Sequence, residues 1–167
     1  VLAAPRPAGV DLLIRASWDR CVRGPERYVW ATVTAHPVAA HLQFKVPRRE
    51  PQAARDTMLA LRFCPLTLRP PRHRQREGLP AVTLWAVHVQ ESEPPADSTP
   101  LEWLLLTTVA VDTVDDAMTR VQWYACRWGI EVWQRILKSG CRIEARQLAS
   151  GERLHRCLTL YSVIAWR

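Results

Sequence analysis

The stretch AVTLWAVHVQE, residues 81–91, decides the fold together with LEWLLLTTVAV, residues 101–111. The first stretch alternates, with Val82 and Leu84 on one side and Thr83 on the other, which predicts a β-strand. The second is an unbroken apolar run, which is typical of a strand buried on both faces in the middle of a covered sheet. The turn-rich segment SEPPADSTP separates the two stretches.

Toward the N-terminus, short apolar or alternating segments predict further strands, with proline-rich and arginine-rich loops between them. The alternation of residues 28–33 favours a strand, and a short helix is the alternative. Pro65 is expected at an edge or a bulge between two paired strands. The loop at residues 70–80 is rich in arginine. It can be a solvated run of charge or a contact with DNA, and the sequence leaves both interpretations open. The remaining predicted strands are residues 10–14, which should be buried, and residues 41–46, 58–63 and 66–68.

The last third of the chain predicts two helices. Residues 112–140 read as one helix that Asp112 or Thr113 can cap and that Gly140 ends. Residues 149–167 read as a second helix, with Ser150 as its cap. Strands therefore dominate the first hundred residues or so, and helices follow a buried strand. This order predicts a fold of mixed α+β or α/β class.

Charge and composition limit the possible partners. Hydrophobic residues make up 48% of the chain, so it is globular. The formal net charge of +7 favours a polyanionic partner, nucleic acid first and a membrane surface second, and a simply basic surface is the alternative. No apolar run reaches the ~18 residues of a membrane span. The five cysteines lack zinc-site spacing, which is typical of an intracellular protein. We therefore expect a cytoplasmic protein that does not enter a membrane.

The stretch YACRWGIEVWQRILK, residues 124–138, gathers its ionisable side chains on one side of the predicted helix. At ~100° per residue and ~1.5 Å rise, a row about 21 Å long forms. This helical row consists of Tyr124, Arg127, Glu131, Arg135 and Lys138. The opposite side consists of Cys126, Ile130, Trp133 and Leu137, which should pack on the rest of the protein. The simplest interpretation of the row is a solvated face with weak ion pairs between residues four apart.

Two features favour a function for the helical row. Tyr124 is one of three tyrosines and Lys138 one of two lysines in the chain. A lone carboxylate among cations is also what a divalent metal beside a phosphate backbone requires. The carboxylate oxygen suits the metal, and arginine or lysine suits the phosphate.

The spacing of four members of the row, Tyr124, Arg127, Glu131 and Lys138, resembles the Y-R-E-K signature of bacterial insertion-sequence transposases of the Asp-Asp-Glu class. The likeness is to the insertion-sequence-four family and its transposon-five type. TPLEWLLLTTVAVDTVDDA is similar to the strand and helix start before that signature, and VDLLIRASWDR to the strand after the family's second catalytic aspartate. KSGCRIEARQLASGERLHRCLTLYSVIAWR resembles its closing segment, so the likeness covers essentially the whole chain.

This resemblance implies the C-terminal part of an RNase H-like catalytic domain with a β-rich insertion subdomain. Residues 1–19 would end the RNase H-like core before the insertion, and residues 20–100 would form the insertion. Residues 101–167 would supply the C-terminal strand and helices of the catalytic domain with the Y-R-E-K motif.

The resemblance also implies roles and partners. Glu131 would be the third catalytic carboxylate and a ligand of Mg²⁺ or Mn²⁺, and Trp103 would stack on a base flipped out of the terminal DNA. Partners would be transposon-end and target DNA, with self-association in a synaptic complex, in the bacterial cytoplasm at the nucleoid. The DNA-binding residues would be Tyr124, Arg127, Arg135, Lys138 and Trp103.

The sequence departs from the family in one respect. The family's first two catalytic aspartates lie N-terminal of anything in this chain, and its other aspartates do not sit in those motifs. Because two-metal chemistry needs several converging carboxylates, the isolated chain should bind DNA weakly without cleaving it. One hypothesis is a fragment of a cut-and-paste DNA transposase that is active in the intact enzyme. The other is a non-catalytic DNA-binding or inhibitory protein derived from a transposase.

Overall fold

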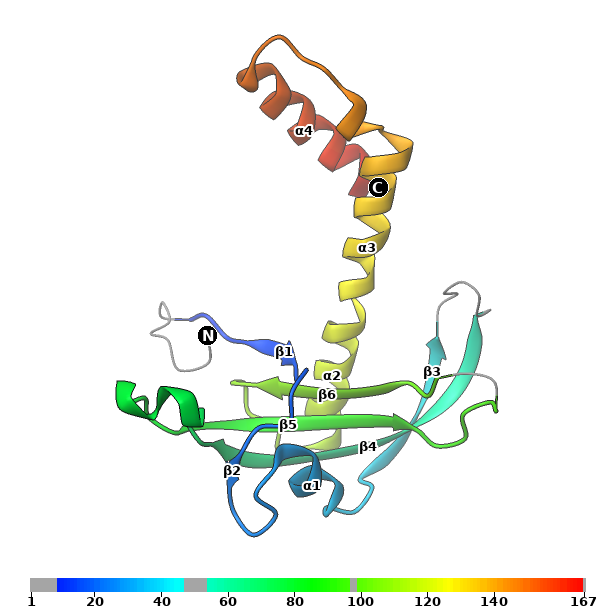
Figure 1. The fold of residues 1–167 in the computed structure, drawn as a ribbon. Coiled ribbons are helices and arrows are strands. Elements are labelled where there is room, and N and C mark those ends of the chain that lie inside the picture. The colour runs from blue at the N-terminus through cyan, green and yellow to red at the C-terminus, as the bar shows by residue number, and fades with distance from the viewer. Residues whose placement is uncertain (1–8, 47–53, 97–98, 167) are drawn as a thin grey trace. The chain divides into compact units, whose positions relative to one another are not determined.

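A computed structural model of the chain describes residues 9–46, 54–96 and 99–166. The chain forms two compact units, Val1–Gln122 and Trp123–Arg167. The first unit holds a β-sheet with its covering helices, and the second is built from helices (Figure 1). The predicted mixed α+β class is thereby confirmed.

The described residues form six strands and a set of helices of different lengths. The strands are β1 (Leu13–Arg15), β2 (Val22–Arg23), β3 (Ala40–Val46), β4 (Arg55–Leu68), β5 (Val82–Glu91) and β6 (Glu102–Thr107). The α-helices are α1 (Val29–Thr34), α2 (Val114–Ala125), α3 (Arg127–Arg135) and α4 (Gly151–Trp166). Two short 3₁₀-helices are η1 (Arg72–Glu77) and η3 (Ile143–Ala145). A π-helical segment is η2 (Ile136–Gly140). None of the described helices combines the length and the apolar character that crossing a bilayer demands.

The six strands form one antiparallel sheet in the order β1-β6-β5-β4-β2, and β3 also pairs with β4. The two strands predicted from residues 81–91 and 101–111 are confirmed as β5 and β6, which lie side by side in its interior. β6 is buried without interruption from Trp103 to Thr107, as expected for a strand covered on both faces.

The sheet includes strands from all three segments into which the sequence was divided. β1 comes from residues 1–19, β2 to β5 from residues 20–100, and β6 from residues 101–167. The boundary between the compact units instead follows Gln122 in the chain. The assignment of these segments to a catalytic core and an insertion stays a prediction.

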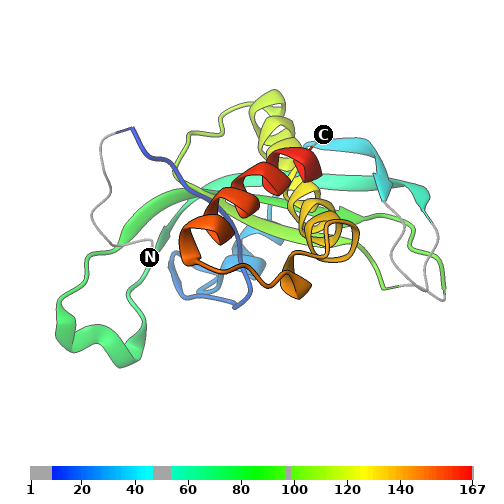
Figure 2. The same cartoon turned by 90° about the horizontal axis from the view of Figure 1, so that it is seen from above.

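Helices cover both faces of the sheet (Figure 2). Because side chains alternate along a strand, the core has one layer on each face. Ala86 of β5 and Leu106 of β6 belong to a buried cluster with the valines of α1. Val87 and Leu105, the neighbouring pair, point to the opposite face, where α2 lies, and are fully buried. Full burial of one aliphatic side chain stabilises the fold by about 1.5–3 kcal/mol, so both layers contribute.

Helix α1 occupies residues for which a strand was favoured, so the strand over residues 28–33 is wrong and the helical alternative is right. Val29 and Val33, four residues apart, are fully buried against the sheet. On the outer side, the hydroxyl of Thr34 donates to the carbonyl of Trp30 at 2.9 Å. Because β-branched residues are poor helix formers, burial of the valine stripe and not intrinsic propensity determines this helix.

β4 is one strand of 14 residues, so the two paired strands expected on either side of Pro65 are wrong. The backbone groups of odd-numbered residues near Pro65 point to the edge of β4 that pairs with β3 and β2. On that edge, the Leu61 carbonyl accepts the Ala39 N–H, and the Arg69 N–H donates to the Cys21 carbonyl. Pro65 therefore faces the interval between β3 and β2, where no described strand pairs with β4. Its missing N–H breaks no ladder hydrogen bond, which explains why a proline is tolerated there.

β1 is shorter and less buried than the apolar run at residues 10–14 suggested. Leu13 and Ile14 are half-buried, not fully buried. The reason is position: among the described strands, β1 pairs with β6 alone and forms one end of the sheet. An end strand keeps part of its side-chain surface in solvent.

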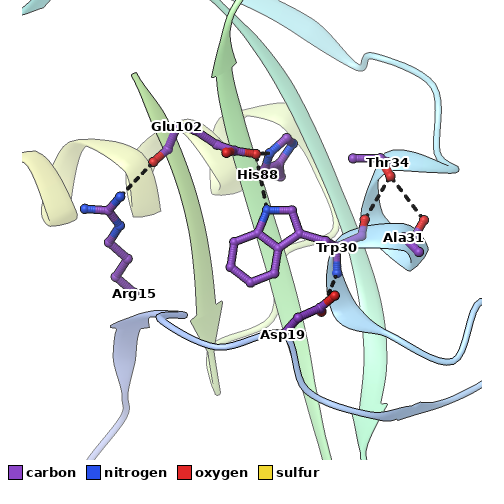
Figure 3. Close-up of polar contacts among 7 residues, drawn as sticks. All are labelled: Arg15, Asp19, Trp30, Ala31, Thr34, His88 and Glu102. Atoms are coloured by element: carbon purple, nitrogen blue, oxygen red, sulfur yellow. Dashed lines mark hydrogen bonds and ion pairs between the residues drawn. The ribbon is translucent and has the colours of Figure 1, made fainter. Parts of the chain in front are cut away.

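A polar cluster joins α1 to the centre of the sheet (Figure 3). Oε1 of Glu102 accepts the Trp30 indole N–H at 3.2 Å and lies 2.9 Å from Nε2 of His88. His88 is buried, and an ionised carboxylate only accepts hydrogen bonds, so Nε2 carries the proton. Asp19 in turn accepts the backbone N–H of Trp30 at 3.2 Å. The cluster therefore fixes the loop before β2 and helix α1 against β5 and β6.

Glu91, at the end of β5, organises a second buried polar cluster. Its carboxylate receives two hydrogen bonds from the Arg55 guanidinium, at 3.1 and 2.8 Å. The Thr57 hydroxyl and the Leu101 amide donate to it at 2.8 and 2.9 Å. The Arg55 hydrogen bonds are the main cause that lowers the pKa of Glu91 to about 2. Because a buried carboxylate is costly without partners, this set ties β4, β5 and the start of β6 together.

Side chains cap the N-termini of helices α2 and α4, as the sequence predicted. The hydroxyl of Thr113 accepts the Asp116 N–H at 3.1 Å, and the Asp116 carboxylate accepts the Thr113 N–H at 3.1 Å. This reciprocal pair is a capping box, so of Asp112 and Thr113 it is Thr113 that caps α2. Ser150 accepts the Arg153 N–H at 3.4 Å, which confirms it as the cap of α4.

We expect the Glu91 cluster to make stability depend on acid pH. The pKa of Glu91 is about 2 in the folded chain, against an ordinary value of 4.5. Its stabilising contribution is therefore complete above about pH 4.5 and is lost as the pH falls toward 2. Glu91→Gln should lower the free energy of unfolding at pH 7 by about 2 kcal/mol or more. It should also reduce the loss of stability between pH 4.5 and 2.

Urea unfolding followed by circular dichroism at several pH values measures both effects. Glu93→Gln is the matched control, because Glu93 is an exposed glutamate two residues away. The same pH dependence in Glu91→Gln and the native chain would contradict this role of Glu91.

Candidate nucleic-acid interface

The second unit concentrates the positive charge of the chain. Residues 123–167 contain eight of the 23 lysines and arginines but three of the 16 acidic residues, and thus five of the seven net positive charges. The three carboxylates all lie in ion pairs within the unit: Glu131 with Arg127, Glu144 with Lys138, and Glu152 with Arg156. The surplus is carried by Arg135, Arg142, Arg146, Arg153 and Arg167, the last of which lies outside the described residues.

Tyr124, Arg127 and Glu131 form one contiguous set. Nη1 of Arg127 donates to Oε1 of Glu131 at 2.8 Å, and the guanidinium carbon lies 5.6 Å from the centre of the Tyr124 ring. The expected contact between Glu131 and a neighbouring arginine is thereby confirmed. The hydrogen bond to Glu131 raises the pKa of Arg127 above its ordinary value. The side chains of Arg127 and Glu131 are 45% and 60% exposed, so the set is open to solvent.

Lys138 belongs to the same row by sequence but has a different partner. Its Nζ lies 2.9 Å from Oε1 of Glu144. The single regular helix expected over residues 112–140 is wrong in detail, because a turn at Cys126 separates α2 from α3 and η2 is π-helical. A π-helical turn holds more residues than an α-helical one, so the ~100° spacing does not extend to Lys138. Arg135, the remaining member of the row, is exposed in the last turn of α3.

The opposite side of α3 packs on α4 only over its second half. The indole N–H of Trp133 donates to the Ser162 carbonyl at 3.0 Å, and Trp133 and Leu137 are half-buried. Cys126 and Ile130, expected on the same packed side, are exposed, so that part of the prediction is wrong. The reason is that Ser162 lies close to the end of α4, which therefore does not extend along the first half of α3.

Arginines that follow the Y-R-E-K motif add positive charge that the motif does not predict. The Arg146 guanidinium lies 4.5 Å from the centre of the Tyr161 ring, and its Nε donates to the Cys141 carbonyl at 3.3 Å. Arg142 is exposed at a turn where its backbone is left-handed, with φ 48°. Local charge could have identified these residues, because positions 139–156 hold four arginines against two glutamates.

The described residues do not complete a metal site around Glu131. Among them, no group of three or more His, Cys, Asp or Glu side chains is placed to hold an ion. Oε1 of Glu131 already accepts from Arg127, and one exposed carboxylate is a poor ligand set for a divalent cation. The described residues alone therefore do not fit the Mg²⁺ or Mn²⁺ that the transposase resemblance implies.

Trp103, expected to stack on a flipped base, is a core residue of the first unit. It is 3% exposed, and its ring meets Phe44 edge-on at a centroid distance of 5.5 Å. Both faces of β6 are covered, so the ring packs in the core, and base stacking by Trp103 stays a prediction. Core packing explains Trp103, and we do not assign it to the candidate interface.

A comparison with models of known protein families finds no match for this chain. A function therefore has to be argued from its geometry and charge and from the sequence resemblance.

Arg127→Ala in the whole chain should weaken binding to duplex DNA and lower the slope of log affinity against log salt by about one, because one phosphate contact is lost. Glu131→Gln should leave affinity unchanged or slightly higher, since it removes the negative charge beside Arg127. Fluorescence anisotropy of a labelled duplex across a salt series measures both. Lys45→Ala, at an exposed lysine on β3 of the first unit, is the control. Unchanged affinity and slope in Arg127→Ala would mean that the row is only a solvated face.

Proposed function

We propose that the chain is the C-terminal part of a DNA transposase of the Asp-Asp-Glu class and that its second unit binds the DNA backbone. The charge surplus of that unit carries the proposal: its three carboxylates are already paired with cations, and further exposed arginines remain. Duplex DNA presents one negative charge per ~1.7 Å, and phosphate contacts dominate its affinity for proteins. The Y-R-E-K likeness favours a transposase over other DNA-binding proteins.

The Arg127–Glu131 ion pair suits an exchange of partners when DNA binds. An exposed pair between residues four apart contributes only about 0.3–0.5 kcal/mol. Hydrogen bonds from arginine to phosphate are charge-assisted and can be bidentate, so they are stronger. A phosphate can therefore take Arg127 from Glu131 at little cost, while the Tyr124 ring keeps contact with the guanidinium.

The intact enzyme would need residues from outside this chain. We propose that Glu131, released from Arg127, contributes one carboxylate to a Mg²⁺ or Mn²⁺ site whose other ligands are the family's two aspartates. Such an enzyme cleaves DNA at the transposon ends and joins it to target DNA within a synaptic complex of several subunits. An RNase H-like core that includes β1 and β6 belongs to the same proposal. We assign no catalytic step to the isolated chain.

A non-catalytic DNA-binding or inhibitory protein is the second candidate. The observation that favours it is the lack of a metal-binding group among the described residues. The two candidates share the DNA interface and differ in strand cleavage.

Expression of the intact reading frame that encodes this chain separates the candidates. We expect the intact protein to nick a plasmid that carries both element ends when Mg²⁺ is present, and the isolated chain not to. Glu131→Gln should abolish nicking and leave DNA binding largely intact, because the carboxylate serves the metal and not the phosphate. Glu152→Gln, at another exposed and ion-paired glutamate of the same unit, is the control.

Nicking at a normal rate by the Glu131→Gln enzyme would show that this carboxylate is only surface charge. Tight DNA binding by an intact reading frame that never nicks would support the second candidate.

A further inference from the structure

The first unit contains a basic pocket that shares no residue with the helical row. The pocket has a volume of about 970 Å³ and lies between the loop that leads into β2 and the segment that follows β4. The side chains that matter for its chemistry are Trp18, Asp19, Arg20, Arg23, Arg27 and Arg69.

The backbone around the pocket is held by the sheet. The Val22 N–H donates to the Arg27 carbonyl at 2.8 Å, which closes the loop between them. The Arg69 N–H donates to the Cys21 carbonyl at 2.9 Å, which ties this loop to the end of β4. All four arginines of the pocket therefore lie on or beside hydrogen-bonded backbone, so the backbone that carries them is held in place.

Arg27 has an unusual backbone conformation at the pocket wall. Its φ is 61°, in the left-handed region that residues with a side chain seldom occupy. Its guanidinium carbon lies 5.3 Å from the centre of the Tyr28 ring. Such conformations persist where the surrounding structure imposes them, and they cluster at ligand sites.

The charge of the pocket is not balanced from within. No described carboxylate forms an ion pair with any of its four arginines. Asp19, the one carboxylate among the described lining residues, accepts the Trp30 N–H instead. Four arginines line one cavity, where their like charges repel each other, and an anion bound there relieves that repulsion.

Trp18 adds a flat apolar surface beside these arginines. It is 77% exposed, the highest exposure of any large apolar residue in the described chain. Exposed aromatic rings next to cationic side chains are the usual stacking platforms for unpaired bases. In a duplex, both faces of each base are covered by its neighbours, so only an unpaired base can reach the ring.

We propose that this pocket binds a nucleotide unit of single-stranded nucleic acid, with its phosphate on the arginines and its base on Trp18. The proposal does not rest on the proposed duplex interface, because it uses no residue of the second unit. It predicts a preference for single strands that depends on Trp18.

Anisotropy of a labelled single strand of about 20 nucleotides, and of the same strand in a duplex, tests the proposal with the whole chain. Trp18→Ala should weaken single-strand binding about 5- to 100-fold and change duplex binding little. Trp18→Phe should keep most of the affinity. The double variant Arg23→Ala/Arg69→Ala should lower the salt slope for the single strand by about 0.7 per lost contact. Lys45→Ala is the control, because Lys45 is an exposed cation of the first unit that does not line the pocket.

Several results would overturn the proposal. One is equal single-strand affinity in the native chain and Trp18→Ala, with circular dichroism showing that both are folded. Another is displacement of the strand by inorganic phosphate as readily as by thymidine 5′-monophosphate, since the base would then contribute nothing. Arg127→Ala separates this proposal from the duplex interface: it should weaken duplex binding and leave the Trp18-dependent binding in place.

Discussion

Burial of β5 and β6 on both faces is the constraint on which the first unit depends. Strands without a solvent-facing side must have their backbone groups paired along both edges and their side chains covered twice. β1 and β4 provide the pairing, and α1 and α2 provide the cover. Two buried polar side chains of this core are paired: Glu91 with Arg55, and His88 through its Nε2 with Glu102. The sheet is therefore a rigid scaffold, from which the loops of the basic pocket project.

The second unit has fewer buried residues than the first. Among its described residues, Cys141, Ile143 and Ala165 are buried, while Leu160 and Trp166 are 62% and 71% exposed. Its helices are held by a few contacts, among them the Trp133–Ser162 hydrogen bond and the Arg146–Tyr161 stack. A unit with little buried apolar area has low local stability. Charge, more than packing, distinguishes it from the sheet, and this charge is the basis of the proposed DNA interface.

Secondary structure could be predicted from the sequence where a residue pattern was long. It could not be predicted where the pattern was short or where the structure depended on residues far away in the chain. β5 and β6 were predictable because each pattern runs for at least six residues. α1 was not, because Val29 and Val33 are four apart, a spacing that fits both the two-residue period of a strand and the helical period. Pro65 is tolerated inside β4 because β3 and β2 leave a gap beside it. The residues around Pro65 do not indicate this gap.

The candidate site shows the same division. The Arg127–Glu131 contact follows from helical spacing and was predictable. The π-helical turn, and the ion pair of Lys138 with Glu144, were not. The burial of Trp103 was hidden because its neighbours in β6 are apolar on both faces, so the sequence does not distinguish a ring in the core from one at the surface. The basic pocket joins residues that are about fifty positions apart in the chain, and only the pairing of β2 with β4 brings them together.

We propose that the second unit binds duplex DNA and that the sheet is a scaffold without a part in duplex binding. Hydrogen–deuterium exchange of the whole chain, measured by mass spectrometry with and without saturating duplex DNA, tests it most directly. We predict slower exchange in peptides from residues 124–156 and unchanged exchange in β5 and β6. Protection confined to the first unit, with residues 124–156 exchanging as they do without DNA, would show that the second unit does not bind the duplex.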